Sequence, residues 1–488
     1  MANKKNLHIK SWLTPPSTEL SDFLAGDNQL VICNGVNPCF QLGQLRKDLG
    51  YTALHVSVGS KQVRSLFDFR QSSSVQKVLF TLNSSDNLNT ELWYWSGSDM
   101  YQITTAAWAT YNGQAVNMAP FLGYCFFVGS DASGNFLPVA SLTGTTFSTS
   151  TNVTSMAQGK FITRYRDRLY VANCKAGGST YPYRVYFSSV PTAGAITWTQ
   201  ATDFFDVDFS EEITGMGVAF DRLVIFTEYN AYVYDQLSRL QQNWPGCVNN
   251  KSIQSSESYL FYANTDGVWC STGGRPQCIS TDINQLIRNS TKSRWSSALV
   301  DRTYTLFLGD TSANGVSYDN LSVNYDIPTG MWWWREYRGT NNTNLLLCNV
   351  KRSGNDYLYL ADGNGVVHVK SKYGDTSPVY TDNSVAISAW FRTKAFDFGD
   401  PSVEKRITKI LAYAIDGSNI ELRFRVLDKN QEALMPFKPI GTVKEMVNIF
   451  DRQINGNFIQ IEGKEYSKNK YFKFLGLSLI LAQETTQD

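Results

Sequence analysis

The stretch DRLVIFTEYNAYVYDQ, residues 221–236, has the pattern of a β-hairpin. Two short runs of aliphatic and aromatic residues flank a polar connection around Glu228 and Asn230. A lone hairpin is only marginally stable in water, because a ribbon of two strands cannot bury both of its faces. We therefore expect other sheets to cover this hairpin on both sides.

Similar hairpins recur along the chain at nearly regular intervals. The steps between successive hairpins range from 37 to 54 residues, and the strands begin near residues 77, 122, 167, 221, 258, 302 and 356. Steps of about 40–50 residues are typical of four-stranded propeller blades, which cover each other's faces around an axis. The spacing predicts an all-β fold with a six- or seven-bladed β-propeller. Stacked β-sandwiches are the alternative that the same pattern allows.

The pattern changes after residue 385, where longer alternating strands appear. In LRFRV (422–426), Leu422, Phe424 and Val426 share one face of a strand and two arginines take the other. This period of two is typical of a sheet with one buried face. The sequence thus predicts an extended N-terminal arm (1–60), a β-propeller (61–385) and a small C-terminal β-sandwich (386–488).

The overall charge is close to neutral. The formal net charge is +1 among 488 residues, whereas proteins that wrap nucleic acid usually carry a basic excess. Passing contact with double-stranded DNA, without sequence-specific binding, is compatible with this balance. The N-terminal MANKKNLHIKSW lacks the apolar run of a secretory signal, and no stretch reaches the roughly 18 apolar residues that span a bilayer. No membrane association is expected.

The motifs of common catalytic and metal sites are missing from the sequence. It has eight cysteines without a CxxC pair and three histidines, so we expect buried free thiols and no zinc site. No G-x-S-x-G, P-loop or H-E-x-x-H motif is present, and His368 fits an ordinary strand histidine. The sequence predicts neither an enzyme nor a bound cofactor.

The densest group of acidic side chains lies in DFFDVDFSEE, residues 203–212. Three interpretations are open: a calcium loop, a ring of negative charge around a channel formed by several copies, and a solvated surface loop. The spacing does not match the twelve-residue EF-hand loop, so no metal site is predicted. The candidate residues are Asp203, Asp206, Asp208, Glu211 and Glu212.

A second candidate site is the aromatic run GMWWWREY, residues 330–337. In a strand, Trp332 and Trp334 would share one face and Trp333 would take the other. Exposed tryptophans can stack on sugar rings, whereas buried ones supply a large apolar area to the core. The position of this run in a strand–turn–strand step favours packing within a blade.

Several stretches together resemble a known family, the β-propeller tail-hub, packaged-DNA-stabilisation and nozzle proteins of short-tailed bacteriophages. The resemblance covers about half of the chain, with similar order and spacing. It is carried by RYRDRLYVANC…YPYRVYFSSVPTAGAITWTQ (164–200), EEITGMGVAFDRLVIFTEYNAYVYD (211–235), PGCVNNKSIQSSESYLFYANTDGVWC (245–270) and WFRTKAFDFGDPSVEKRITKI (390–410).

The resemblance implies a structural virion protein that is made in the host bacterial cytoplasm and resides in the virion tail. Copies would form a ring, expected to be hexameric, next to the portal, adaptor and other tail proteins. Such a ring retains packaged DNA and forms part of the ejection channel. The alternatives are a carbohydrate- or receptor-binding propeller tail protein and, ranked below it, a propeller glycosidase.

Overall fold

The computed structural model describes most of the chain, namely residues 7–9, 12, 14, 16–19, 24–26, 28–39, 43–55, 58, 61–72, 74–83, 89–111, 116–131, 134–235, 239–339, 345–400, 402, 404–415, 420–428, 431–434, 438–439, 447–448, 454–468 and 470–481. The remaining parts of the predicted arm and sandwich, including residues 1–6 and 482–488, lie outside this description. Within the described ranges the one α-helix is α1 (Asn284–Arg288), and strands dominate. The prediction of an all-β chain is confirmed.

Five four-stranded antiparallel sheets follow one another along the described chain, each in sequential strand order. They consist of β6 (Val63–Arg70), β7 (Gln76–Asn83), β8 (Thr90–Trp95) and β9 (Met100–Ile103); β10 (Val116–Phe121), β11 (Tyr124–Gly129), β12 (Ala140–Thr143) and β13 (Thr146–Ser148); β14 (Gln158–Tyr165), β15 (Arg168–Ala176), β16 (Ser179–Phe187) and β17 (Phe204–Asp206); β18 (Ile213–Ala219), β19 (Arg222–Thr227), β20 (Asn230–Tyr234) and β21 (Arg239–Pro245); β22 (Gln254–Ser255), β23 (Leu260–Asn264), β24 (Gly267–Ser271) and β25 (Gln277–Cys278).

Two further four-stranded units continue this series, but each is part of a larger sheet. The sixth unit contains β26 (Ser296–Val300), β27 (Thr303–Ala313), β28 (Val316–Asp326) and β29 (Met331–Glu336). The seventh contains β30 (Leu346–Arg352), β31 (Asn355–Ala361) and β32 (Val367–Lys370), and its fourth strand is β5 (Tyr51–Ala53) from near the N-terminus. The last unit is therefore completed by a strand that precedes the first.

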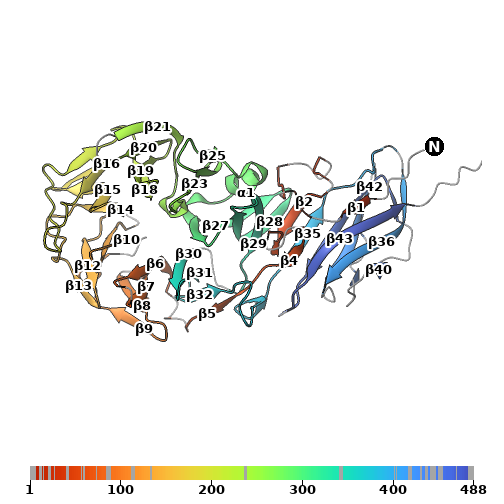
Figure 1. Ribbon diagram of the computed structural model, residues 1–488, viewed down its shortest axis with the longest axis horizontal. Coiled ribbons are helices and arrows are strands. Elements are labelled where there is room, and N and C mark those ends of the chain that lie inside the picture. Colours follow the sequence, from red (N-terminus) through yellow and green to blue (C-terminus); the bar gives the residue numbers. More distant parts are fainter. Residues whose placement is uncertain are drawn as a thin grey trace, which may run out of the picture.

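The units are arranged in a ring, as in a β-propeller (Figure 1). The first strand of each unit lies next to the first strand of the following one, and β30 lies next to β6, which closes the ring. The hairpin β19–β20 illustrates how each unit is buried. Leu223 and Ile225 pack toward the preceding unit, whereas Val224, Phe226 and Val233 pack toward the following one. Successive sheets thus cover both faces of the hairpin, because alternate residues point to opposite faces.

Beyond the ring, two sheets face each other at the C-terminal end of the molecule (Figure 1). One contains β1 (Leu7–Ile9), β3 (Val36–Asn37), β4 (Leu45–Lys47), β36 (Lys405–Ile415), β40 (Val447–Asn448), β41 (Ile454–Gly456) and β43 (Lys473–Leu481). The other contains β2 (Leu30–Asn34), β35 (Ala389–Thr393), β37 (Glu421–Asp428), β38 (Gln431–Leu434), β39 (Lys438–Pro439) and β42 (Phe458–Glu465). The short pair β33 (Thr381–Asp382) and β34 (Val385–Ala386) extends the seventh unit.

The first sixty residues are shared between these two parts of the molecule. Strands β1 to β4 belong to the C-terminal sheets and β5 belongs to the ring. The side chain of Trp12 is 1% exposed, and its ring centroid lies 6.1 Å from that of Phe474 and 6.3 Å from that of Phe391. The described strands of residues 1–60, which the sequence suggested were an extended arm, therefore belong to three different sheets.

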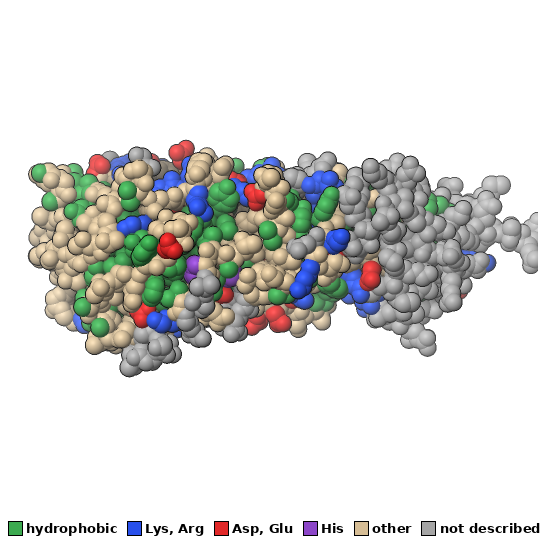
Figure 2. Space-filling view, turned by 90° about the horizontal axis from the view of Figure 1, so that it is seen from below, with side chains coloured by type: hydrophobic (Ala, Val, Ile, Leu, Met, Phe, Trp, Pro, Cys, Tyr) green, Lys and Arg blue, Asp and Glu red, His purple; other side chains and the backbone are tan. Residues whose placement is uncertain are grey.

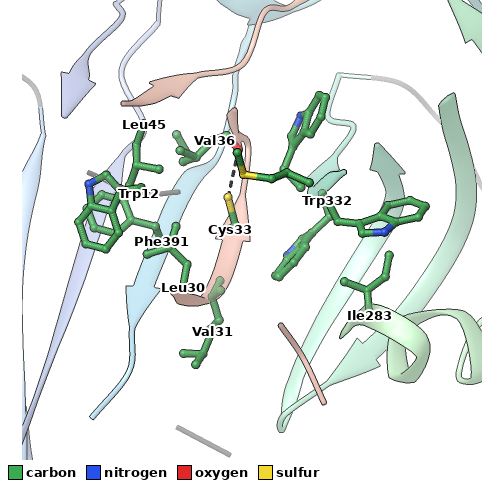
Figure 3. Packing of buried hydrophobic residues seen from close by; sticks show 14 of the residues in the cluster. Trp12, Leu30, Val31, Cys33, Val36, Leu45, Ile283, Trp332 and Phe391 are labelled. Atoms are coloured by element: carbon green, nitrogen blue, oxygen red, sulfur yellow. Dashed lines mark hydrogen bonds between the residues drawn. The ribbon is translucent and has the colours of Figure 1, made fainter. Parts of the chain in front are cut away.

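Strand β2 joins the ring to the C-terminal region. It pairs in parallel with β29 of the sixth unit, at Asn34 opposite Trp334, and antiparallel with β35. One ten-stranded sheet consequently runs from the ring into the C-terminal sandwich. Figure 3 shows Trp12 and Phe391 on one side of β2 and Trp332 and Ile283 on the other.

Candidate functional site

The acidic segment 203–212 leads from the outermost strand of one unit to the first strand of the next. Strand β17, which ends at Asp206, is the last strand of its sheet, whereas Glu212 directly precedes β18 beside the ring centre. Asp203 lies just before β17, where its carboxylate accepts a hydrogen bond from Thr202. The segment thus spans the radius of the ring instead of lining one surface.

Most of these carboxylates have local partners. Arg184 donates two hydrogen bonds to Asp206, of 2.6 and 2.8 Å. Glu212 pairs with Lys160 at 2.7 Å. Burial opposes ionisation of Glu212, but hydrogen bonds from Lys160 and Asn173 hold its pKa below the usual value.

The other two acidic residues are held by neutral groups. Glu211 accepts hydrogen bonds from Thr227 and Asn230. Asp208 accepts bonds from the backbone and side chain of Ser210, and these lower its pKa. Within the described ranges no group of three or more His, Cys, Asp or Glu residues is arranged to hold a metal ion.

The tryptophan run occupies β29, where both faces of the sheet are covered. Trp332, Trp333 and Trp334 are 1%, 3% and 0% exposed, and Trp332 donates a 2.7 Å hydrogen bond from Nε1 to the carbonyl of Ile279. Because β2 pairs with β29 on its outer side, this strand lies inside a sheet and not at its edge. The ring faces of the three tryptophans are therefore not open to a sugar at the surface.

A polar pocket of about 290 Å³ lies between the sixth unit, the seventh unit and the segment around residues 37–49. Three ion pairs line it, with N–O distances between 2.8 and 3.0 Å: Arg302–Asp326, Lys372–Asp301 and Lys370–Asp48. The sequence motifs gave no indication of this pocket, because its residues come from three distant parts of the chain.

The thiol of the pocket is not activated as a nucleophile. Burial and the neighbouring Asp326 carboxylate raise the pKa of the Cys39 thiol to about 12, so this sulfur stays protonated at neutral pH. Each carboxylate in the three pairs already has a cationic partner. Thr305, Asn324 and Trp333 add a hydroxyl, an amide and an indole to the lining, which suits a polar, uncharged ligand.

Beside the pocket lies a buried ionic network centred on Arg335 of β29. Its guanidinium, which is 0% exposed, donates to the Asp382 carboxylate and the Leu49 carbonyl, and lies 3.3 Å from Asp48. Burial raises the pKa of Asp382 to about 6, although Arg335 opposes this. Burial also tends to raise the pKa of Asp48. The positive charges of Lys370 and Arg335 outweigh this effect, so the pKa of Asp48 lies below its usual value. The network ties the sixth unit, the seventh unit and the N-terminal segment together.

The turn η2 (Asn250–Ser252) lies at the centre of the ring. Asn250 accepts a hydrogen bond from the Met216 backbone at 3.1 Å and donates one to Asn117, on another side of the ring, at 3.0 Å. Two glycines of β18 make room for this turn. A Cβ on Gly215 would lie 2.6 Å from Cδ1 of Ile253, and one on Gly217 would lie 2.9 Å from Cγ2 of the same residue.

The sequence contains a signal for the buried Arg335 and another for the close packing beside β18, although neither belongs to a known motif. Arg335 directly follows three tryptophans in MWWWREY, and a charged residue in such an apolar strand requires buried partners. The glycines of ITGMG (213–217) sit in a strand, where a glycine often marks a close approach of another backbone or side chain. Neither signal identifies the partner residues.

These features define the molecule as an all-β protein of the β-propeller type, with a polar pocket and a closed ring centre. Among the described residues, none of the helices is long and apolar enough to cross a membrane. All eight cysteines are free thiols.

No protein-family model matches this chain, and no curated protein matches it either. Among solved structures, it is similar to PorZ, a surface component of the type-IX secretion system of Porphyromonas gingivalis, with 11% identity and a TM-score of 0.38 over 74% of this chain and 44% of that one. It is also similar to the extracellular domain of BT4673 from B. thetaiotaomicron, with 12% identity and a TM-score of 0.39 over 82% and 47% of the two chains. This chain spans less than half the length of either structure, and the likeness concerns the fold alone.

Proposed function

We propose that this protein is a structural component of the tail of a short-tailed bacteriophage, built as a seven-bladed β-propeller with a C-terminal β-sandwich. Copies assemble into a hexameric ring next to the portal, adaptor and other tail proteins, where they retain packaged DNA and form part of the ejection channel. The protein would be made in the host bacterial cytoplasm and reside in the virion tail. The family resemblance of residues 164–410 is the starting point of this proposal.

The observation that carries the proposal is the continuous connection between the ring and the C-terminal sheets. Strand β2 links β29 to β35, and the Arg335 network fixes the same junction from inside. A body with backbone pairing across its two parts resists hinge motion, because bending would break buried hydrogen bonds. Such rigidity suits a scaffold, and we propose that the chain has no enzymatic activity.

The DNA path in this proposal runs between copies of the chain and not through one ring of blades. The hydrogen bond between Asn250 and Asn117 crosses the centre of that ring. A B-DNA duplex is much wider than such a closed centre, since its major groove alone measures about 12 Å. The channel is therefore a property of the assembly.

The charge distribution supports passage of DNA through the assembly without tight binding. Figure 2 shows basic and acidic side chains scattered over one face, with no continuous basic band among the residues drawn in colour. A basic wall would hold DNA by releasing counterions from many phosphates. Of the five acidic candidates, Asp206 and Glu212 are in ion pairs, so their charge is neutralised locally.

Native mass spectrometry of the purified protein tests the assembly. Six copies of 54.8 kDa would give a species of roughly 330 kDa, and negative-stain images should show a closed ring. A monomer at all concentrations, alone and with the portal and adaptor present, would contradict the proposal.

A second candidate function is the binding of a carbohydrate or receptor, and the polar pocket favours it. Its ion pairs and amide could accept and donate hydrogen bonds to the hydroxyl groups of a sugar. Tryptophan fluorescence during sugar titration would report binding near Trp333. The variant Arg302→Gln should abolish the response, whereas Arg294→Gln, which alters an exposed ion pair with Asp310, should not. An equal response in both variants would exclude this pocket.

A further inference from the structure

A second cavity, of about 190 Å³, lies at the centre of the ring. Its walls come from the first strands β6, β10, β26 and β30, and from the turn η2 with the start of β22. The polar residues that line it are Ser65, Asn117, Asn250, Lys251, Gln254 and Ser296, with Ser297 beside them. No carboxylate is among the lining residues.

Lys251 places a positive charge in this cavity without a negative partner among the described residues. Its Nζ contacts the backbone carbonyl of Arg64 at 3.4 Å, a long and weak hydrogen bond. Burial and the nearby Arg64 guanidinium lower the pKa of Lys251 to about 8, and no carboxylate counteracts them. At neutral pH the ammonium form still prevails, so a partly buried cation lines this half-open cavity without a described counter-charge. Such a group is costly unless it is paired.

Two hydroxyl groups in the same cavity are poised as donors. The Ser65 oxygen accepts a hydrogen bond from the Val116 backbone at 2.7 Å, and the Ser296 oxygen accepts one from Leu347 at 2.9 Å. Both serines are buried, at 7% and 3% exposure, and the described residues contain no acceptor for their hydroxyl hydrogens. A hydroxyl carries one donor hydrogen, which prefers an acceptor when it is out of water.

The amides of the cavity, in contrast, each donate a hydrogen bond within the ring. Asn117 donates to the Lys160 carbonyl at 2.7 Å, Asn250 donates to Asn117, and Gln254 donates to the Ser297 carbonyl at 3.0 Å. Lys251, Ser65 and Ser296 thus line one cavity and bring to it one ammonium, held by a single weak hydrogen bond, and two hydroxyls. Such donors are complementary to an anion.

We propose that this axial cavity binds one small tetrahedral oxyanion, inorganic phosphate or sulfate, held by the Lys251 ammonium and the hydroxyls of Ser65 and Ser296. The cavity has several times the volume of a water molecule, which occupies about 30 Å³, so it accommodates such an ion with some water. The bound ion would connect β6, β26 and η2, which lie on different sides of the ring. This site does not depend on the proposed tail function.

A phosphate of DNA is a less suitable ligand for the same donors. It carries a sugar on each side and is therefore bulkier than a free ion, whereas the cavity measures about 190 Å³ and the Asn250–Asn117 bond crosses the ring centre beside it. The free ion and the DNA phosphate share one chemistry, so the test includes both as separate probes.

Thermal unfolding of the full-length protein, titrated with phosphate or with sulfate, tests the proposal. The wild-type Tm should rise with a saturable dependence on the ion, beyond the rise in chloride at equal ionic strength, because a ligand that binds only the folded state stabilises it. The variants Lys251→Met and Lys251→Gln should weaken the apparent affinity by at least about tenfold. Lys175→Met, at an exposed position in β15, is the matched control and should behave as the wild type.

Three results would overturn the proposal. The first is a wild-type Tm that rises without saturation and equally in the Lys251 variants, which is the general effect of salting-out anions. The second is an unchanged affinity in both variants. The third is a response to a short DNA duplex that is lost in the Lys251 variants while phosphate and sulfate have no effect. If Lys251→Met does not fold, Lys251→Gln and calorimetric titration of the wild type with sulfate decide the question.

Discussion

Replacing Arg335 with methionine removes the centre of the buried network at the junction of ring and sandwich. Methionine has a similar length and no charge, so the change tests the ionic contacts more than the packing. It deprives Asp382 of its cation, whereas Asp48 keeps Lys370 at 3.0 Å. Asp382 then retains the hydrogen bond from the Arg338 backbone, of 3.1 Å, and the weaker attraction of Lys370.

The expected loss in the free energy of unfolding follows from the uncompensated charge of Asp382. Removing one partner of a buried ion pair typically destabilises a protein by about 3–5 kcal/mol. In a protein of this size, whose m-value is correspondingly large, such a loss corresponds to a decrease of about 1 M in the urea midpoint. The exposed pair Arg166–Asp221, with side chains 38% and 71% exposed, supplies the control. Arg166→Met should leave the urea midpoint almost unchanged, because solvent screens this pair.

The cost of Arg335→Met should also depend on pH. The pKa of Asp382 is raised to about 6 in the folded protein and lies near 3.9 in the unfolded chain. A raised carboxyl pKa means that the folded state takes up a proton first as the pH falls, which stabilises it relative to the unfolded state. Loss of Arg335 raises this pKa further. At pH 5.5 more of the Asp382 carboxyl is protonated and needs no cation. Arg335→Met should therefore lower the free energy of unfolding less at pH 5.5 than at pH 7.5.

Urea unfolding followed by tryptophan fluorescence at these two pH values measures both effects. We expect a large loss for Arg335→Met at pH 7.5, partial recovery at pH 5.5, and little change for Arg166→Met at either pH. Equal midpoints for the two variants, or a penalty independent of pH, would refute the assignment of a buried ionic centre to this junction.

Three more predictions concern the core, the ring centre and ring closure. Trp334→Ala should lower the free energy of unfolding by about 3–5 kcal/mol in urea titrations, since this side chain is 0% exposed; a change below 1 kcal/mol would argue against its burial. Gly215→Ala should lower the free energy of unfolding by about 1–3 kcal/mol, because the new methyl group meets Cδ1 of Ile253. Adding Ile253→Val removes that atom and should restore part of the stability, which calorimetry of the single and double variants can check. Thr52→Pro, in the middle of β5, should weaken the pairing of β5 with β32 and lower the urea midpoint; an unchanged midpoint would show that this pairing is dispensable.

The sequence was informative wherever burial alternates along one strand. Leu422, Phe424 and Val426 are buried in β37, as their spacing of two indicates, and the recurring hairpins correspond to successive four-stranded sheets. Both signals are local, because the direction of a side chain in a strand is set by its neighbours in the sequence.

The candidate sites were harder to interpret, because their environment depends on distant strands. The charge of Asp206 is neutralised by Arg184 on the neighbouring strand, and that of Glu212 by Lys160 in the preceding strand group. The three tryptophans are buried because residues distant in the sequence, such as Val36 and Ile283, belong to the same core cluster. The composition of either segment alone does not reveal these neighbouring residues.

The sequence alone determined that the chain is all-β and built from repeated hairpins, since alternation and turn chemistry are properties of adjacent residues. Only the tertiary structure decided that β5 completes the last unit, that β2 joins the ring to the C-terminal sheets, that Arg335 is buried among ionic partners, and that Lys251 lines the central cavity. The reason is physical: backbone hydrogen bonds between strands are nearly independent of sequence, so the choice of partner strand depends on how the whole molecule buries its faces.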